Sequence, residues 1–119
     1  MSFVKAVWIF GSAVKKSRAY SDIDLAVHIQ PITEKNKDEV LSHGSDLIDI
    51  SIFTDLPIVI QFEVISKGKL IYKAKNFKIA EFLSGVNLRY LDFKPLYERS
   101  LKLYKEKLKN EKIAVHGIL

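Results

Sequence analysis

The chain has 119 residues, no cysteine and a formal net charge of +5, and 48% of its residues are hydrophobic. This length predicts a single domain, residues 1–119, with enough buried surface for a hydrophobic core. The absence of cysteine excludes a disulfide framework and a thiolate metal site. No apolar run is long enough to cross a membrane and the N-terminus does not resemble a signal peptide, so we expect a cytoplasmic protein.

Predicted strands and helices follow one another along the first two thirds of the chain. Runs of β-branched and aromatic residues predict strands at 3–10, 22–27, 47–53 and 69–72. The polar segment 34–43 predicts a short helix that Gly44 ends. Asp55 and Pro57 predict the start of a helix that runs to Gly68. This order predicts an α/β (α+β) fold, a small mixed β-sheet with helices packed on it.

The C-terminal part becomes helical from about residue 76. Asp92 and Pro95 predict a break between two helices, and residues 114–119 are expected to be a frayed tail. An apolar stripe recurs at helical spacing at Tyr97, Leu101, Tyr104 and Leu108. It fits either a side that faces the core or a seam for a partner. Five lysines crowd the same segment and fit a solvated helix face, a nucleic-acid surface or a docking face for an acidic partner: Lys102, Lys105, Lys107, Lys109 and Lys112.

Three aspartates lie in the predicted strands. Asp22 and Asp24 are two residues apart, so their carboxylates project from one face of their strand. Asp49 lies in a later predicted strand, on the face opposite its isoleucines. Acids in apolar strands are costly unless a cation neutralises them, and neither run contains Arg or Lys. We therefore predict that the three carboxylates hold divalent metal ions, which they share with a nucleotide triphosphate.

A Gly-Ser pair follows the first predicted strand. Gly11 lets the backbone approach a phosphate, and Ser12 can donate a hydrogen bond to it. A short helix expected at 13–17 would add backbone N–H groups. Three cations in this loop are candidate phosphate ligands: Lys15, Lys16 and Arg18. Each feature alone also fits a turn or a surface pair, and their combination favours a nucleotide site.

The aromatic residues and the histidines have simpler interpretations. Trp8 and the phenylalanines are predicted to be core residues. The three histidines are isolated in the sequence and are expected to be surface or hydrogen-bonded residues rather than metal ligands: His28, His43 and His116.

The order of these motifs, Gly11-Ser12, then Asp22-x-Asp24, then Asp49, resembles the polymerase-beta-type nucleotidyltransferase superfamily. The short length resembles its minimal nucleotidyltransferase (MNT) group, whose members are commonly the antitoxin partners of HEPN-domain toxins. Further segments are similar to the same family, so the likeness spans roughly residues 3–108; they lie at 46–50, 68–72 and 90–95.

The resemblance implies a polymerase-beta-like fold and Mg²⁺-dependent transfer of AMP from ATP. Ser12 with Gly11 would hold the triphosphate, and Asp22 and Asp24 would bind two Mg²⁺ ions. Asp49 would complete the second metal site and help to activate the acceptor hydroxyl. In the antitoxin branch the acceptor is a tyrosine of the HEPN toxin, and the added AMP silences the RNase activity of that toxin.

Other functions stay open at this stage. Relatives usually have a helix before the first strand, where this chain has two residues, so we expect a sheet face that is uncovered or covered by a partner or a second copy. The chain could be an antitoxin that acts by contact, without efficient chemistry. It could also be a transferase acting on a small molecule or a nucleic acid, although polymer substrates normally require additional domains.

Overall fold

The computed structural model describes residues 1–11 and 23–118. Within them, four strands form one mixed sheet in the order β3-β2-β1-β4. Their bounds are β1 Val4–Phe10, β2 Ile23–Ile29, β3 Ile48–Ile52 and β4 Lys69–Lys73. Strand β1 is antiparallel to both β2 and β4, whereas β2 and β3 are parallel. The four predicted strands are confirmed to within two residues at each end.

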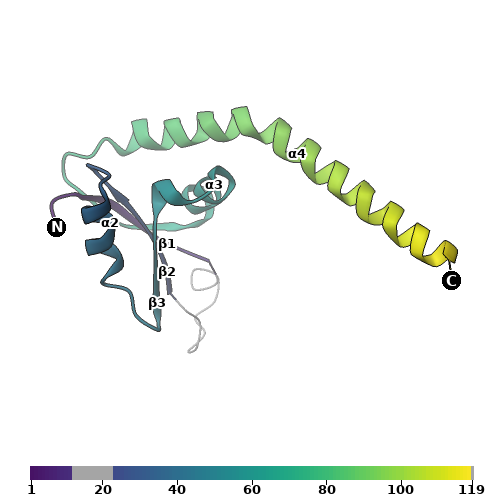
Figure 1. Ribbon diagram of the computed structural model, residues 1–119. Coiled ribbons are helices and arrows are strands. Elements are labelled where there is room, and N and C mark those ends of the chain that lie inside the picture. The colour runs from purple at the N-terminus through teal and green to yellow at the C-terminus, as the bar shows by residue number, and fades with distance from the viewer. Residues whose placement is uncertain (12–22, 119) are drawn as a thin grey trace.

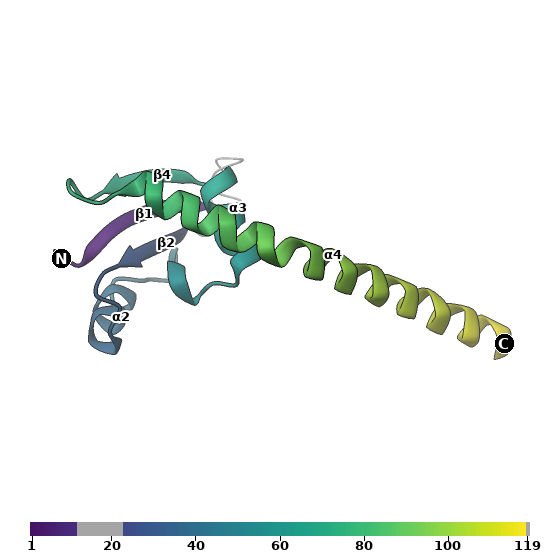
Figure 2. The ribbon, with the colours of Figure 1, turned by 90° about the horizontal axis from the view of Figure 1, so that it is seen from above.

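Helices cover both faces of the sheet (Figures 1 and 2). Helix α3 (Ile58–Lys67) and the first part of α4 (Ile79–Ile118) pack on one face, and α2 (Glu34–Leu41) packs on the other. A 3-10 turn, η1 (Phe53–Asp55), joins β3 to α3. The prediction of a small mixed α/β sheet with helices packed on it is confirmed.

The larger core lies between the sheet and helices α3 and α4. Trp8 is 3% exposed and its ring centroid lies 5.1 Å from that of Phe53 and 5.7 Å from that of Phe82. Val64 of α3 and Val86 of α4 are fully buried against this cluster. Burial of large aromatic side chains supplies much of the stability of a domain of this size, and the prediction that Trp8 is a core residue is confirmed.

Helix α2 covers part of the opposite face through a smaller core. Its Val40 packs with Val27, Ile29 and Ile52. The Thr33 side chain caps the helix by accepting a hydrogen bond from the Asn36 backbone N–H. At the start of β2, Ile23 is 37% exposed, so α2 does not extend over the whole face.

The expected cap of α3 by Asp55 is wrong. Helix α3 begins at Ile58 with Pro57 as its N-cap, and no side chain caps it. Asp55 instead belongs to η1 and accepts a hydrogen bond from Lys37 Nζ at 3.0 Å, which ties η1 to α2. Asp55 lies two residues before the N-cap Pro57, and its carboxylate contacts a lysine far away in the sequence, which a local sequence pattern does not reveal.

The predicted break at Asp92 and Pro95 is also wrong, because α4 is one continuous helix with Pro95 inside it. Proline removes one backbone hydrogen bond and crowds the preceding turn, which bends a helix when the flanking turns persist. Figure 1 shows the axis of α4 changing direction partway along. The helix also continues to Ile118, so the expected frayed tail from residue 114 is not observed.

The C-terminal part of α4 projects away from the sheet (Figures 1 and 2). The last aromatic contact between α4 and α3 is the stack of Tyr90 on Phe62, with ring centroids 3.9 Å apart and an interplanar angle of 6°. The molecule is accordingly elongated, with principal extents of 61 × 36 × 28 Å. In the described part of the chain, no helix combines the length and the hydropathy needed to span a membrane.

Candidate functional site

Gly11 directly follows β1 and has a left-handed backbone, with φ = +82°. A Cβ atom placed on Gly11 would lie 2.5 Å from Asp24 Oδ2, closer than such atoms approach in folded proteins. Both the φ angle and this close contact require glycine. At the end of β1, the backbone therefore approaches the Asp24 carboxylate without an intervening side chain.

Asp24 and Asp49 are register partners on the adjacent parallel strands β2 and β3. Paired residues of neighbouring strands lie about 5 Å apart and project from the same face of the sheet. Asp24 is half-buried and Asp49 is exposed. The structure thus brings two of the three predicted acids together, beside Gly11.

The remaining predicted site residues lie in the segment 12–22, outside the described residues: Ser12, Lys15, Lys16, Arg18 and Asp22. The short helix expected at 13–17 falls in the same segment. Their roles in phosphate and metal binding stay predictions. Among the residues that the structure does describe, no group of three or more His, Asp or Glu side chains could hold a metal ion.

The described residues nevertheless fit a divalent cation. Asp24 and Asp49 supply carboxylate oxygens, the ligands that Mg²⁺ prefers, from one face of the sheet. Gly11 leaves beside the Asp24 carboxylate a space that any other residue would fill with its Cβ atom. Asp22 would add a third carboxylate two residues before Asp24 in the sequence.

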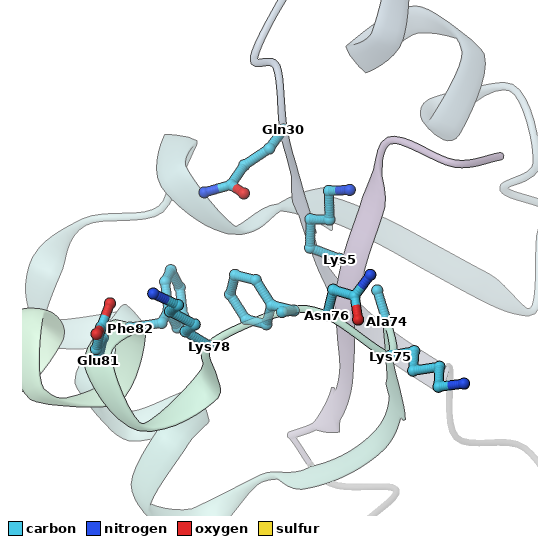
Figure 3. Close-up of a pocket in the computed structure, with 9 residues that line it drawn as sticks. Lys5, Gln30, Ala74, Lys75, Asn76, Lys78, Glu81 and Phe82 are labelled. Atoms are coloured by element: carbon cyan, nitrogen blue, oxygen red, sulfur yellow. The ribbon is translucent and has the colours of Figure 1, made fainter.

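A separate pocket of about 630 Å³ lies at the other end of strands β1 and β2 (Figure 3). Lys5 near the start of β1 and Gln30 just after β2 line it, whereas Gly11 follows β1 and Asp24 lies at the start of β2. The rest of its wall comes from the segment 74–78 and from Glu81 and Phe82 of α4. This pocket is therefore distinct from the candidate site.

His28 lies close to this pocket, and the prediction of a surface or hydrogen-bonded histidine is wrong for it. Its side chain is 4% exposed and packs against the rings of Phe53, Phe77 and Phe82. Neither ring nitrogen has a hydrogen-bond partner among the described residues. Burial lowers the pKa of His28 to about 4, because the charged imidazolium would lose its hydration. The side chain is therefore a neutral core residue at neutral pH.

Solved structures with a similar fold come from toxin–antitoxin complexes. A chain from a complex described as the toxin–antitoxin with AMP-PNP has a TM-score of 0.67 and 16% identity, covering 86% of each chain. A chain from a mutant of the toxin–antitoxin MntA-HpeT has a TM-score of 0.66 and 15% identity, again covering 86% of each chain. A third comes from the tri-AMPylated Shewanella oneidensis HEPN toxin in complex with its MNT antitoxin, with a TM-score of 0.62, 17% identity, and coverage of 86% of this chain and 83% of that chain.

Sequence comparison identifies the family. No curated protein sequence matches the chain. The family model described as polymerase beta, nucleotidyltransferase, matches residues 2–77, which include all four strands and the acids of the candidate site. The chain therefore belongs to the polymerase beta nucleotidyltransferase family, as the order of its Gly-Ser and aspartate motifs predicted.

Proposed function

We propose that this chain transfers AMP from ATP to a tyrosine hydroxyl of a cognate HEPN toxin, and so acts as the antitoxin of that pair. The observation that supports this proposal best is the pairing of Asp24 with Asp49 beside the bare backbone of Gly11. The toxin–antitoxin structures with a similar fold support it as well, because one contains AMP-PNP and another an AMPylated HEPN toxin.

Each site residue has a role in this proposal. Gly11 and Ser12 bind the triphosphate, assisted by the cations of the same loop, Lys15, Lys16 and Arg18. Asp22, Asp24 and Asp49 hold two Mg²⁺ ions. When bound, such ions neutralise phosphate charge and lower the pKa of an attacking hydroxyl.

The transfer itself exchanges one phosphorus–oxygen bond for another. The tyrosine oxygen forms a bond to the α-phosphorus of ATP, and the bond from that phosphorus to the oxygen bridging to the β-phosphate breaks. Pyrophosphate leaves with the bridging oxygen. Asp49, the more exposed of the two described acids, accepts the hydroxyl proton.

The test uses two forms of radiolabelled ATP with the cognate HEPN toxin, which is sought among the genes next to the one that encodes this chain. Label in the α-phosphate is expected to appear on the toxin, whereas label in the γ-phosphate is expected to leave with pyrophosphate. Label from the γ-phosphate on the toxin would instead indicate phosphoryl transfer and would contradict the proposal. Absence of both labels from the toxin would also contradict it.

Substitution of the acids tests the roles of the residues. Asp24→Asn and Asp49→Asn should each lower the transfer rate by about a thousandfold, because a lost metal ligand costs several kcal/mol of transition-state stabilisation. Asp38→Asn is the matched control, since Asp38 is an exposed acid on α2 and lies outside the candidate site. Equal rates for Asp24→Asn and Asp38→Asn would contradict the assigned site.

A second candidate function is neutralisation by contact alone, which the exposed apolar side chains of α4 favour. Cells that produce the toxin distinguish the two functions. If the Asp24→Asn variant protects these cells as well as the native chain does, contact is sufficient. If protection is lost together with AMP transfer, the chemistry is required.

A further inference from the structure

The face of α4 that packs on the core continues along the helix after the helix has left the body of the protein. At about 100° per residue, one face of the helix carries Ile79, Leu83, Val86 and Tyr90. The first three of them belong to or pack against the larger core, between the sheet and helices α3 and α4. The same face continues, within about 40° of the same line, through Phe93, Tyr97, Leu101, Tyr104 and Leu108. We call these five side chains the distal stripe.

Four of the five side chains of the distal stripe are exposed, and Tyr97 is half-buried. Leu101, Leu108 and Tyr104 are 37%, 39% and 60% exposed, and α4 extends past Tyr90 by 28 residues, to Ile118, or about 42 Å. Helices of globular proteins gain most of their stability from packing an apolar face, which this part of α4 does not do within the described chain. An apolar stripe that is mostly exposed from Phe93 to Leu108 is typical of a helix that packs against another protein.

The charges beside the stripe indicate what kind of surface would cover it. Leu101 lines a shallow groove of about 440 Å³ together with Lys102, Lys105, Lys109, Glu98 and Glu106. Glu98 already pairs with Lys94, with 3.9 Å between Nζ and Oε1. Among the described residues, by contrast, no carboxylate lies within ion-pair distance of any of the three groove lysines. A partner that supplies carboxylates next to an apolar face would satisfy both features.

A second copy of this chain fits the groove less well. Residues 91–111 carry six basic and four acidic side chains, so two copies would bring two net positive segments together. Each copy would also add the same unpaired lysines to the seam. Like charges set against each other at an interface cost several kcal/mol and select against that pairing.

We infer that the distal stripe, with Lys102, Lys105 and Lys109 at its edge, is the docking surface for an apolar face of the toxin that is bordered by carboxylates. This inference rests on the proposed function, since it takes the toxin as the partner. It assigns recognition of the partner to α4 and leaves the chemistry to the end of the sheet where Gly11, Asp24 and Asp49 lie.

Two matched double variants test the inference. Leu101→Glu with Leu108→Glu changes the stripe, and Leu103→Glu with Asn110→Glu makes the same change in charge, at the same spacing of seven residues, on another face of the helix. All four positions are exposed, so both variants should keep the fold, which circular dichroism checks. Binding to the cognate HEPN toxin is measured by calorimetry without ATP.

The stripe variant should raise the Kd at least a hundredfold, and the control variant less than threefold. Lys102→Glu with Lys105→Glu should raise the Kd about tenfold, with a weaker salt dependence than the native chain shows. This third variant keeps every apolar side chain, so it tests the surface even if the stripe variant loses helix. Equal affinity of the stripe and control variants would overturn the inference, and so would native affinity of the lysine variant.

The same proteins separate this inference from the proposed function. If the native chain binds the toxin and the stripe variant does not, but no AMP is transferred, then the docking surface stands and the proposed chemistry fails. If AMP is transferred by the native chain and the stripe variant binds normally, then the chemistry stands and the docking surface fails. Sedimentation of the chain alone is expected to give a monomer, and a dimer that only the stripe variant dissociates would assign the surface to a second copy and overturn the inference.

Discussion

Replacing Gly11 by alanine tests whether the candidate site depends on bare backbone beside Asp24. The new Cβ would stand 2.5 Å from Asp24 Oδ2, whereas ordinary contact begins at about 3.4 Å, so the two atoms must separate by about 0.9 Å. The φ of +82° must also be kept by a residue with a Cβ atom, which costs about 1–2 kcal/mol. The substitution therefore displaces the carboxylate and strains the loop.

The displaced carboxylate affects the transfer rate, and the strained loop affects stability. A displacement of about 1 Å in a catalytic group lowers rates by about a hundredfold. The strain should lower Tm by roughly 4 °C for each kcal/mol in a protein of this length. We expect Gly11→Ala to stay folded at room temperature, with AMP transfer to the HEPN protein slowed about a hundredfold.

Gly85→Ala is the matched control. Gly85 lies inside α4, and a Cβ atom there would meet only Arg89 Nη1, at an ordinary 3.5 Å. Alanine inside a helix is more favourable than glycine by about 0.5–1 kcal/mol, so Tm should rise while the transfer rate stays unchanged. If Gly11→Ala transferred AMP as fast as Gly85→Ala, the close approach of Gly11 to Asp24 would have no part in the function.

Three further predictions concern the scaffold. Because burial lowers the pKa of His28 from 6.5 to about 4, the unfolded chain binds a proton at this side chain more readily than the folded chain, so the free energy of unfolding is greatest above about pH 6.5 and falls as the pH drops toward 4. Urea denaturation should show that the free energy of unfolding falls by on the order of 2 kcal/mol between about pH 7.5 and pH 5. A His28→Phe variant with the same fall would refute His28 as its origin. Pro95→Ala should restore a backbone hydrogen bond inside α4 and raise stability, by up to about 3 kcal/mol; a lower Tm for this variant would show that the bend itself is stabilising. A double-mutant cycle that combines Phe62→Leu with Tyr90→Leu should give a coupling energy of about 0.5–1.5 kcal/mol from the stacked rings, and a coupling near zero would contradict a role for the stack in fixing α4 on α3.

The features that sequence predicted best depend on residues close together in the chain. The β-branched runs placed all four strands, because alternation and apolar runs are local consequences of strand geometry. Gly68 ended α3 as expected, and the structure adds the reason: a Cβ atom at Gly68 would clash with the Val64 carbonyl oxygen and lie 3.0 Å from that of Ile9.

The features that sequence missed depend on residues far apart in the chain. His28 looked isolated because Phe53, Phe77 and Phe82, which surround it, are 25 or more residues away. Pro95 looked like a helix end because the rule considers a single lost hydrogen bond, whereas the persistence of α4 depends on the turns on either side. The register that sets Asp24 opposite Asp49 was expected only in general form, since strand pairing is not encoded at either residue.

The boundary of the family match suggests why site and docking surface are separate. The match ends at residue 77, and α4 begins at Ile79, so the strands and the acids lie within the shared part while the distal stripe lies outside it. Changes in the exposed stripe would not disturb the register of Asp24 with Asp49, because no stripe residue belongs to either core cluster. In this arrangement, substitutions on α4 change the partner while the positions of Asp24 and Asp49 are kept. The stripe and control variants should therefore bind free ATP with equal affinity, even where their affinities for the toxin differ a hundredfold.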